Sequence, residues 1–274
     1  MAGLVLAIVL GKRKGWPTTL FRPHNVPFVM LGAGLLWFGW YGFNAGSATS
    51  SNGAAGATFM TTTIATATAM LFWLLTERIR DGHATTLGGA SGIVAGLVAI
   101  TPSCSSVNAL GALVIGAVAG VLCALAVGLK FRLGFDDSLD VVGVHLVGGL
   151  AGTLLVGLLA APESVAINGV AGVSKGLFYG GGFDQLERQA AGAFSVLFYS
   201  ATVTLIIALL LKYTIGLRLS PEGEEAGIDE SQHAESGYDF ATATGSVLPH
   251  ASLPDGANGS LEERVDDRVE AEQK

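Results

Sequence analysis

Charged residues are scarce in this sequence, and their scarcity is the first guide to its class. Asp, Glu, Lys and Arg make up 14 % of its 274 residues, whereas soluble domains carry about 25 %. The apolar residues gather in long blocks instead of alternating with polar ones, and the mean hydropathy is +0.55. A soluble core needs polar faces between its apolar ones, so the pattern indicates that lipid is the solvent of most of the chain.

The chain has only two cysteines, Cys104 and Cys123, and both lie in or beside apolar blocks. Their spacing provides neither a disulfide framework nor a zinc ligand set, so we expect buried thiols, no metal and no cofactor. The apolar blocks also lack a His-Glu-x-x-His motif and a nucleophile paired with a base. This lack argues against an intramembrane enzyme.

Glycine is abundant, with 39 residues, and much of it recurs at helical spacing. Gly88, Gly92 and Gly96 share one helix face, and Gly116 and Gly120 share another. Small residues on one face let the backbones of two membrane helices approach closely. The pattern therefore predicts tightly packed membrane helices.

The net charge of −7 is the sum of two unlike regions. Residues 1–219 carry 12 Lys/Arg and 8 Asp/Glu, a net charge of +4, whereas residues 220–274 carry 3 and 14, a net charge of −11. We interpret 1–219 as a transmembrane domain and 220–274 as an acidic tail. The distal part of the tail, residues 241–274, is polar and poor in aromatics, and we expect it to be disordered.

Six apolar blocks have about the length that crosses a bilayer, roughly 20 residues of helix. Strands of a membrane barrel would be about ten residues long and would alternate strictly, and these blocks do not alternate. The sequence therefore predicts an all-α, polytopic membrane helical bundle. The expected spans are about 27–48, 54–76, 86–103, 108–130, 138–160 and 190–213.

A seventh apolar block, residues 2–11, runs directly into Lys12, Arg13 and Lys14. Ten residues of helix cover about 15 Å, which is half of a bilayer. A signal peptide places its charges before the apolar run and not after it. We therefore interpret the block as the last half of a spanning helix whose first half is absent.

The basic residues test the topology, because loops on the cytoplasmic side carry the excess of Lys and Arg. If the helices alternate in direction, ten basic residues fall on one side and two on the other. We therefore expect a multi-pass protein of the cell (inner) membrane, with a cytoplasmic tail and an external loop 161–189. The larger set is Lys12, Arg13, Lys14, Arg22, Arg78, Arg80, Lys130, Arg132, Lys212 and Arg218, and the smaller is Lys175 and Arg188.

His145 lies inside the span 138–160, where an ionisable side chain is costly and indicates a functional site by default. Its neighbours on a helix would be Val141 on one side and Gly148 and Gly149 on the other. The imidazole would then project between an apolar side chain and a backbone notch, where the neutral form is favoured. A neutral imidazole can donate or accept a hydrogen bond and can relay a proton. From spacing alone, a histidine that only bonds a neighbouring helix is an equal alternative.

Three aspartates precede His145 at the start of the same span. For Asp136 and Asp137 we expect capping of the helix N-terminus, where a carboxylate accepts backbone N–H groups and complements the helix dipole. Asp140 lies one step further in. For this residue we favour a cap or a structural ion pair over a proton relay.

A second group of residues ends the first span, where aromatics crowd around a short polar segment. Phe43 and Ser47 stand four residues apart and share a helix face with Leu36, which precedes Phe43 by seven. An apolar wall, an aromatic ring and a hydroxyl near the outer surface could line a narrow pore, and aromatic faces attract small cations. On spacing alone, we favour the interfacial belt that Trp and Tyr form in many membrane proteins over a pore lining.

At these two segments the sequence resembles the ammonium transporter family, the ammonium/methylammonium permeases related to the Rh proteins. Two shorter segments, Thr101-Pro102-Ser103-Cys104 and Gly227-Ile228-Asp229 with His233-Ala234-Glu235 and Gly237-Tyr238, also resemble that family in order. The two longer segments resemble its sixth-helix and tenth-helix signatures. They read Gly39-Trp40-Tyr41-Gly42-Phe43-Asn44-Ala45-Gly46-Ser47 and Asp136-Asp137-x-x-Asp140-Val141-x-x-Val144-His145-x-Val147-Gly148-Gly149.

The resemblance implies a homotrimer with one apolar, histidine-lined pore per subunit, through which ammonium passes after losing its proton. His145 would be the second histidine of the pore, Phe43 a ring of the outer gate, and Ser47 a hydroxyl of the recruitment site. Leu36 and Val141 would be pore wall, with structural support from Asp140, Trp40, Asn44, Gly148 and Gly149. The segment of Gly227, Asp229, His233, Glu235 and Tyr238 resembles a regulatory tail that couples to PII-type signalling proteins.

The sequence also departs from the family pattern. The resemblance covers the end of the fifth helix and the sixth to eleventh of eleven, so the first pore histidine, the other gate phenylalanine and the vestibule tryptophan would be missing. Val142 and Leu146 also stand where Phe and Gly are expected beside His145. We therefore expect an incomplete transporter subunit for ammonium or methylammonium. The alternatives are an ammonium sensor that signals through its tail and a non-functional fragment.

Overall fold

The computed structural model describes residues 1–18, 23–162, 164 and 174–237, and within these ranges it contains helices and loops but no strand. This confirms the predicted all-α class. By its internal contacts the chain divides into two units, Met1–Arg218 and a second unit that begins at Leu219. Tyr238, residues 241–274 and part of the predicted loop 161–189 lie outside the described residues.

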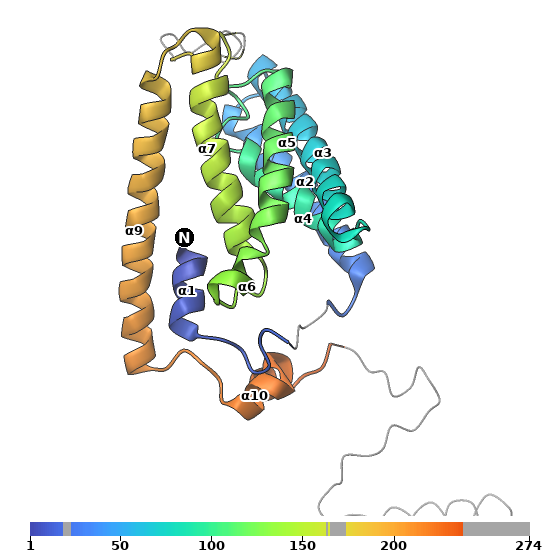
Figure 1. Ribbon diagram of the computed structural model, residues 1–274, viewed down its shortest axis with the longest axis vertical. Coiled ribbons are helices and arrows are strands. Elements are labelled where there is room, and N and C mark those ends of the chain that lie inside the picture. The colour runs from blue at the N-terminus through green and yellow to red at the C-terminus, as the bar shows by residue number, and fades with distance from the viewer. Residues whose placement is uncertain (19–22, 163, 165–173, 238–274) are drawn as a thin grey trace, which may run out of the picture. The chain divides into compact units, whose positions relative to one another are not determined.

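The first unit is a bundle of helices joined by turns and loops (Figure 1). A 3-10 turn, η1 (Gly46–Ala48), follows the second helix, a π-helical turn, η2 (Val142–Leu146), precedes the seventh, and a 3-10 turn, η3 (Leu177–Tyr179), precedes the last. The helices are α1 (Ala2–Leu10), α2 (Val26–Asn44), α3 (Gly53–Asp81), α4 (Thr86–Ile100), α5 (Ala109–Ala126), α6 (Leu129–Leu133), α7 (Val147–Leu159) and α9 (Asp184–Thr214).

Five helical stretches are long and apolar enough to cross a membrane, and α4 is apolar but has only 15 residues. The chain is therefore a multi-pass membrane protein. The five stretches are Val26–Ala48, Gly53–Asp81, Ala109–Leu133, Val142–Leu159 and Asp184–Thr214.

Polar side chains fix where the helices α2, α3, α4 and α5 begin. Each lies in extended backbone just before its helix and accepts a hydrogen bond from the backbone N–H three residues later, which satisfies a donor that the helix itself leaves unpaired. The four residues are Asn25 before α2, Asn52 before α3, Thr85 before α4 and Asn108 before α5.

The centre of the bundle is formed by α3, α4 and α5, which pack through small residues. A Cβ added to Gly92 or Gly96 of α4 would lie within 3 Å of the α3 backbone, and Gly116 and Gly120 of α5 also approach α3 closely. The buried side chains here are mostly Ala, Thr and Ile, and the larger ones include Leu97 of α4 and Trp73 of α3. The glycine spacing thus corresponds to close helix contacts.

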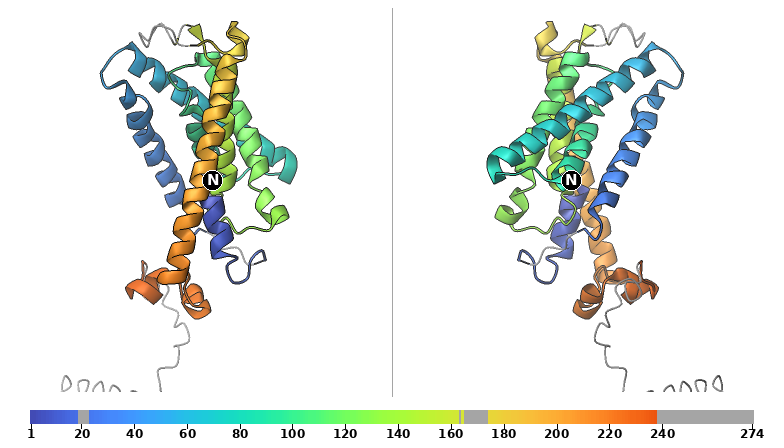
Figure 2. Two further views of the ribbon diagram at one scale, coloured as in Figure 1. Left: turned by 90° about the vertical axis from the view of Figure 1, so that its left-hand side faces the viewer. Right: turned by 90° about the vertical axis from the view of Figure 1, so that its right-hand side faces the viewer.

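The remaining helices surround this centre, and α4 links them. It packs against α2 on one side and against α7 on the other, while α9 lies beside α7 and α1 (Figures 1 and 2). Successive long helices run in opposite directions, as Figure 2 makes plain. Lys212 of α9 donates to the carbonyl of Val9 near the end of α1, so the last turns of these two helices lie together.

Two helices extend beyond the apolar blocks that the sequence marks. Helix α3 continues past residue 76 to Asp81, and α9 begins at Asp184, six residues before the expected span. Charge ends an apolar block but not a helix, because a helix that leaves the hydrocarbon layer can continue in the interface. The extension of α3 carries Glu77, a buried carboxylate that accepts hydrogen bonds from Trp73 Nε1 and from the N–H of Thr85.

Candidate functional site: a histidine-lined cavity and an aromatic helix end

The segment that carries His145 begins with three aspartates, each held by a different partner. Asp137 accepts from the N–H groups of Val141 and Val142, at 3.1 and 2.7 Å, and so caps the π-helical turn. Asp140 has a left-handed backbone, with φ of 57°, and its carboxylate lies 2.6 Å from Lys130 Nζ. Asp137 and Asp140 thereby fix the start of the segment that carries His145, which we call the His145 element.

Asp136 does not cap a helix, contrary to the sequence-based expectation. Its carboxylate accepts three hydrogen bonds from Arg13, from the backbone N, Nε and Nη2, at 2.7–2.8 Å. Burial by itself raises the pKa of this carboxyl, but the Arg13 hydrogen bonds outweigh it and hold the pKa below its ordinary value. The pair ties the segment after α1 to the loop that leads to His145.

The π-helical turn positions His145 on the face opposite to its packed side. Val144 is buried with Trp73 and Cys123, and a Cβ added to Gly143 would meet the backbone of Val127 at 2.9 Å. These contacts press Gly143 and Val144 against α5. His145, the next residue, is exposed and turns away from α5.

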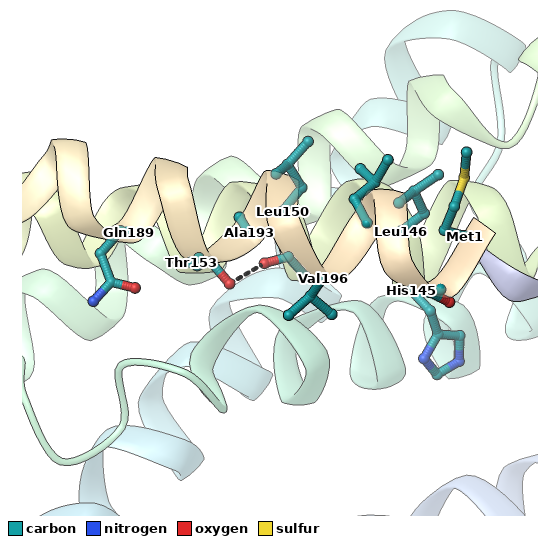
Figure 3. A pocket seen from close by; sticks show the side chains of 12 residues that line it. Met1, His145, Leu146, Leu150, Thr153, Gln189, Ala193 and Val196 are labelled. Atoms are coloured by element: carbon teal, nitrogen blue, oxygen red, sulfur yellow. Dashed lines mark hydrogen bonds between the residues drawn. The ribbon is translucent and has the colours of Figure 1, made fainter. Parts of the chain in front are cut away.

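The His145 side chain lines an open cavity of about 400 Å³ between α7 and α9 (Figure 3). Leu146, Leu150 and Val196 form apolar parts of its wall. The polar groups are Thr153 from α7, whose Oγ1 donates to the Gly149 carbonyl at 2.8 Å, and Gln189 and Ser200 from α9. The cavity is therefore a mostly apolar space with an imidazole in its wall, beside a stretch, Val142–Leu159, that is long and apolar enough to span a membrane.

The two glycines after His145 have different surroundings. Gly149 lines the cavity beside the imidazole. Gly148 is buried, and a Cβ placed there would lie 3.1 Å from Cys123 Sγ and 3.6 Å from a Val98 methyl. The notch expected on both glycines is thus filled at Gly148 by the neighbouring helices and stays open only at Gly149.

The end of α2 presents the second group of residues that the sequence indicated. The Phe43 ring is 64 % exposed and meets the Trp40 ring edge-on, with centroids 6.2 Å apart. The Ser47 hydroxyl donates to the Phe43 carbonyl at 2.7 Å, so its oxygen lone pairs remain able to accept a hydrogen bond. Leu36 is exposed on the same helix.

A chain of polar side chains anchors this helix end to α4 and α3. Trp40 Nε1 donates to Thr101 Oγ1 at 2.8 Å, and this hydroxyl lies 3.3 Å from Asn44 Oδ1. The buried Asn44 in turn donates to Thr62 Oγ1 at 3.1 Å. Thr101 and Thr62 are members of the site that sequence reasoning missed as individual residues. Only the run Thr101–Cys104 signalled this region, through its resemblance to a family segment.

The structure does not bring all the predicted site residues into one space. Among the described residues, the lining of the His145 cavity includes none of Phe43, Ser47, Leu36 and Val141. Val141 instead faces α1, where a Cβ added to Gly3 would meet its Cγ1 at 2.9 Å. The α2 end and the His145 segment are both packed against α4, which is the element that relates them.

The described part of the second unit contains two short helical turns. Helix α10 (Pro221–Ala226) is capped by Ser220, and a π-helical turn, η4 (Asp229–His233), follows Gly227, whose φ is +93°. Glu235 donates its N–H to the Asp229 carbonyl. Gly227, Asp229, His233 and Glu235 therefore lie within one compact turn, and Tyr238 lies outside the described residues.

No group of three or more His, Cys, Asp or Glu residues suitable for a metal occurs in the part of the chain that the structure describes. The polar groups that line the cavity can accept and donate hydrogen bonds, and among the described residues no hydrogen bond joins the His145 imidazole to the hydroxyl of Ser200 or Thr153. The arrangement suits the passage or binding of a small polar molecule.

Comparisons with known proteins point in one direction. The family model described as Ammonium Transporter Family matches residues 1–238. Proteins named ammonium transporter from Mycobacterium tuberculosis and Mycobacterium bovis are each 78 % identical to this chain over 275 residues, covering 100 % of it and 57 % of their own length. One from Aquifex aeolicus is 47 % identical over 88 % of this chain and 54 % of its own.

Solved structures agree with these relatives. The crystal structure of Saccharomyces cerevisiae Mep2 superimposes with a TM-score of 0.74 at 40 % identity, over 81 % of this chain and 50 % of that one. A structure titled "Sensor Amt Protein" gives a TM-score of 0.72 at 33 % identity, over 84 % of this chain and 56 % of that one. The chain spans about half the length of the relatives it matches.

Proposed function

This chain belongs to the ammonium transporter family, and on that premise we propose that it forms part of an ammonium-conducting path. The family is one of transporters and not of enzymes. In the proposed path ammonium is recruited at the α2 end, gives up its proton, and crosses an apolar region beside His145. The observation that carries the proposal is the imidazole in the wall of a mostly apolar cavity, on a stretch that is long and apolar enough to span a membrane.

The chemistry of the α2 end supports recruitment. Ammonium is a small cation with four N–H donors, so it favours an aromatic face and hydrogen-bond acceptors. Phe43 offers an exposed ring, and Ser47 offers an oxygen whose own proton is already given to the Phe43 carbonyl. The link from Trp40 to Thr101 and Asn44 would hold this helix end in place while the cation binds.

The apolar surroundings of His145 support passage of the neutral molecule. A hydrated K⁺ would have to shed water in a space that offers few replacement ligands, and this barrier excludes it. Ammonium avoids the barrier by releasing its proton, and neutral ammonia then needs only a hydrogen-bond partner. The imidazole of His145 is such a partner, and in the proposed path Leu36 and Val141 are apolar wall.

The test replaces the matching segment of the Mycobacterium tuberculosis ammonium transporter with this chain and expresses the chimera in a strain that lacks ammonium transporters. The chimera should restore growth on low ammonium, and its His145→Ala variant should not. His83→Ala is the matched control, because His83 lies outside the long helices, after α3, and is exposed. Immunoblots of the membrane fraction establish equal insertion. Equal growth of the His145→Ala chimera would refute the assigned role.

The residues 1–274 expressed alone form a second arm of the same assay. Growth from this chain would mean that it conducts without further helices. No growth from a well-inserted chain, beside growth from the chimera, would mean that the path needs residues outside this sequence. Methylammonium toxicity in the same strains would report whether methylammonium also passes.

Localisation and assembly are part of the proposal. The excess of basic residues on one side favours a cell-membrane protein with a cytoplasmic C-terminus. The resemblance to the family favours a homotrimer, and large apolar side chains on α2, such as Phe28, Leu35 and Phe38, are exposed and available for helix contacts or lipid. Native mass spectrometry of the purified protein would give the number of copies.

A sensor function is the second candidate, favoured by the similarity to the structure titled "Sensor Amt Protein". In this case the turn around Gly227, Asp229, His233 and Glu235, continuing to Tyr238, would contact a cytoplasmic signalling protein, of which a PII-type protein is the proposed example. Pull-down of a PII-type protein by residues 219–274, and its loss in an Asp229→Ala variant, would support this function. Transport without any such contact would oppose it.

A further inference from the structure

The N-terminal segment of the chain holds the segment that leads to His145 at three points. The first point is a close approach, since a Cβ added to Gly3 would lie 2.9 Å from Val141 Cγ1. The last is a stacked pair of rings with centroids 6.3 Å apart. The three contacts follow one another in reverse order along the sequence, so the two segments run antiparallel. Their partners are Gly3 with Val141, Arg13 with Asp136, and Trp16 with Phe131.

The middle contact is the most specific of the three. The Asp136 carboxylate accepts hydrogen bonds from the backbone N, Nε and Nη2 of Arg13 at 2.7–2.8 Å, and the Asp136 side chain is 2 % exposed. A fork of N–H donors on one carboxylate fixes both the distance and the angle between the two groups. A buried ion pair is weak evidence for stability, because apolar residues of similar volume often serve as well. What this pair supplies in addition is a defined position for Asp136.

Arg13 itself extends from a backbone that is held in place. The Arg218 guanidinium donates to the carbonyl of Leu10 at 3.1 Å and to the carbonyl of Lys12 at 2.6 Å. The Leu10 carbonyl ends α1 and has no donor within the helix, and a cation at this end also complements the helix dipole. The two residues before Arg13 are thereby anchored, and the position of its guanidinium is well defined.

The position of Asp136 is passed on to the π-helical turn through the next residue. Asp137 caps this turn by accepting from two of its first backbone N–H groups, at 3.1 and 2.7 Å. His145 is the fourth residue of the same turn. A displacement of Asp136 would move the cap and with it the start of the turn. The orientation of the imidazole therefore depends on where Asp136 is held.

We propose that Arg13 and Asp136 are positioning residues of the ammonium path, which place the His145 imidazole in the wall of its cavity. Among the described residues, the cavity lining includes neither of them. The proposal rests on the proposed function for the role of His145, but the position of the imidazole can be measured without transport. An ion pair that only adds stability would leave the imidazole in place whenever the chain is folded, and this separates the two roles.

The first experiment records the position of the imidazole by NMR of the full chain in detergent, with ¹³C in the histidine rings. His145→Gln identifies the His145 signal among those of the five histidines. Asp136→Asn removes the charge that Arg13 binds and should move the His145 signal by more than its line width, as should Arg13→Gln. Arg13→Lys keeps the charge but lacks the fork of donors, so it should give a smaller displacement.

Asp81→Asn is the matched control. It makes the same chemical change in another arginine pair, Arg80 with Asp81 at 2.7 Å, whose side chains are 41 % and 38 % exposed at the end of α3. The His145 signal should stay in place in this variant. Melting temperatures of all variants, followed by tryptophan fluorescence, establish that each chain is folded under the conditions of the NMR measurement.

The second experiment measures ammonium uptake by the chimera of the growth assay over a range of concentrations. Asp136→Asn should lower the maximal rate per inserted protein about tenfold. KM should be unchanged, because the proposed recruitment residues Phe43 and Ser47 lie at the α2 end and not beside Asp136. No uptake by the unsubstituted chimera would refute the proposed function, and the NMR comparison would then decide the positioning role by itself.

Three results would overturn the proposal. The first is an unmoved His145 signal in a folded Asp136→Asn chain or, if that chain does not fold, in folded Arg13→Lys. The second is an equal displacement of the signal in Asp81→Asn, which would make the effect a general one of lost charge. The third is a rise in KM at an unchanged maximal rate, which would locate the effect at recruitment and not at His145.

Discussion

Helices α4 and α9 belong to the same bundle but are built on opposite plans. Ten of the 15 residues of α4 are buried, whereas Ala208 is the single buried residue among the 31 of α9. Seven of the 15 residues of α4 are Gly or Ala, whereas α9 carries large apolar side chains such as Phe198, Ile206 and Leu210 on its exposed surface. Lipid chains and Leu side chains are equally apolar, so burial of apolar surface does not by itself drive the association of membrane helices. Close approach of the backbones through small residues, with the van der Waals contacts it allows, stabilises the association instead.

This difference shows how the site is divided between the two kinds of helix. The tightly packed α4 contacts both the α2 end and the His145 element, and so it fixes their relative positions. The exposed α9 contributes a wall of the His145 cavity through Gln189, Val196 and Ser200. The relative position of the α2 end and His145 should therefore depend on the packing of α4, and the shape of the cavity should depend on α9.

The largest expected effect comes from adding one methyl group to each helix. Gly96→Ala places a Cβ 2.7 Å from Thr66 Cα and 2.8 Å from Ala69 Cβ, so α3 and α4 must separate. We expect a loss of about 2 kcal/mol in the free energy of unfolding. Gly192→Ala in α9 meets nothing within 4 Å and should be neutral or slightly stabilising. Thermal unfolding in detergent, followed by tryptophan fluorescence, measures both, and equal melting temperatures would contradict the distinction.

A slightly smaller effect is expected where α4 begins. Removing Glu77 leaves the N–H of Thr85 and Nε1 of Trp73 without their acceptor in a buried place. Glu77→Ala should therefore cost about 1–3 kcal/mol. Glu187→Ala is the counterpart in the exposed first turn of α9 and should change the free energy by less than about 0.5 kcal/mol. A comparable loss in both variants would mean that carboxylates near helix ends matter irrespective of burial.

The contribution of the Arg13–Asp136 ion pair to the stability of the fold should depend on pH. The folded-state pKa of Asp136 is below its ordinary value, so the pair stabilises the fold above the unfolded-state pKa of about 3.9. This contribution is lost as the pH falls through the folded-state pKa. Asp136→Asn should thus lower the melting temperature at pH 6, and its difference from wild type should shrink below about pH 4. A difference that stays constant down to pH 3 would contradict the ionised pair.

The smallest effect is expected from the outer face of α9. Phe198 is 73 % exposed, and Phe198→Ala should change the free energy of unfolding of the single chain by less than about 0.5 kcal/mol. A large loss in Phe198→Ala, accompanied by a change in copy number, would show that α9 is covered by another chain in the assembly.

The fold class was accessible from the sequence because membranes allow few alternatives. A backbone in hydrocarbon must satisfy its own hydrogen bonds, so long apolar blocks without alternation predict helices. The family was accessible through the runs around Phe43 and His145. The burial of Glu77 could not be predicted, because an acidic residue after an apolar block is interpreted as the end of a span. Its burial depends on Thr85, which lies eight residues further along the chain.

The surroundings of the site residues were less accessible. The contact of Trp40 with Thr101 joins residues 61 positions apart, and no local pattern reports such a pair. The notch expected at Gly148 is occupied by Val98 and Cys123 from two other helices. Spacing on one helix gives the face of a residue but not what fills the space opposite. The π-helical turn was equally hidden, because its sequence, Val-Gly-Val-His-Leu, contains nothing that distinguishes a π turn from an α turn.

That turn has a consequence for how the His145 element can vary. A π turn holds one residue more than an α turn. The residues before it, Asp140 and Val141, therefore face a different direction, relative to α7, from the one that a continuous α-helix would give them. Deleting one residue between Val142 and Leu146 would restore regular winding and turn one part by about 100° against the other. Asp140 would then swing away from Lys130, or His145 away from its cavity. The additional residue of the π turn therefore allows Asp140 to pair with Lys130 while His145 lines the cavity.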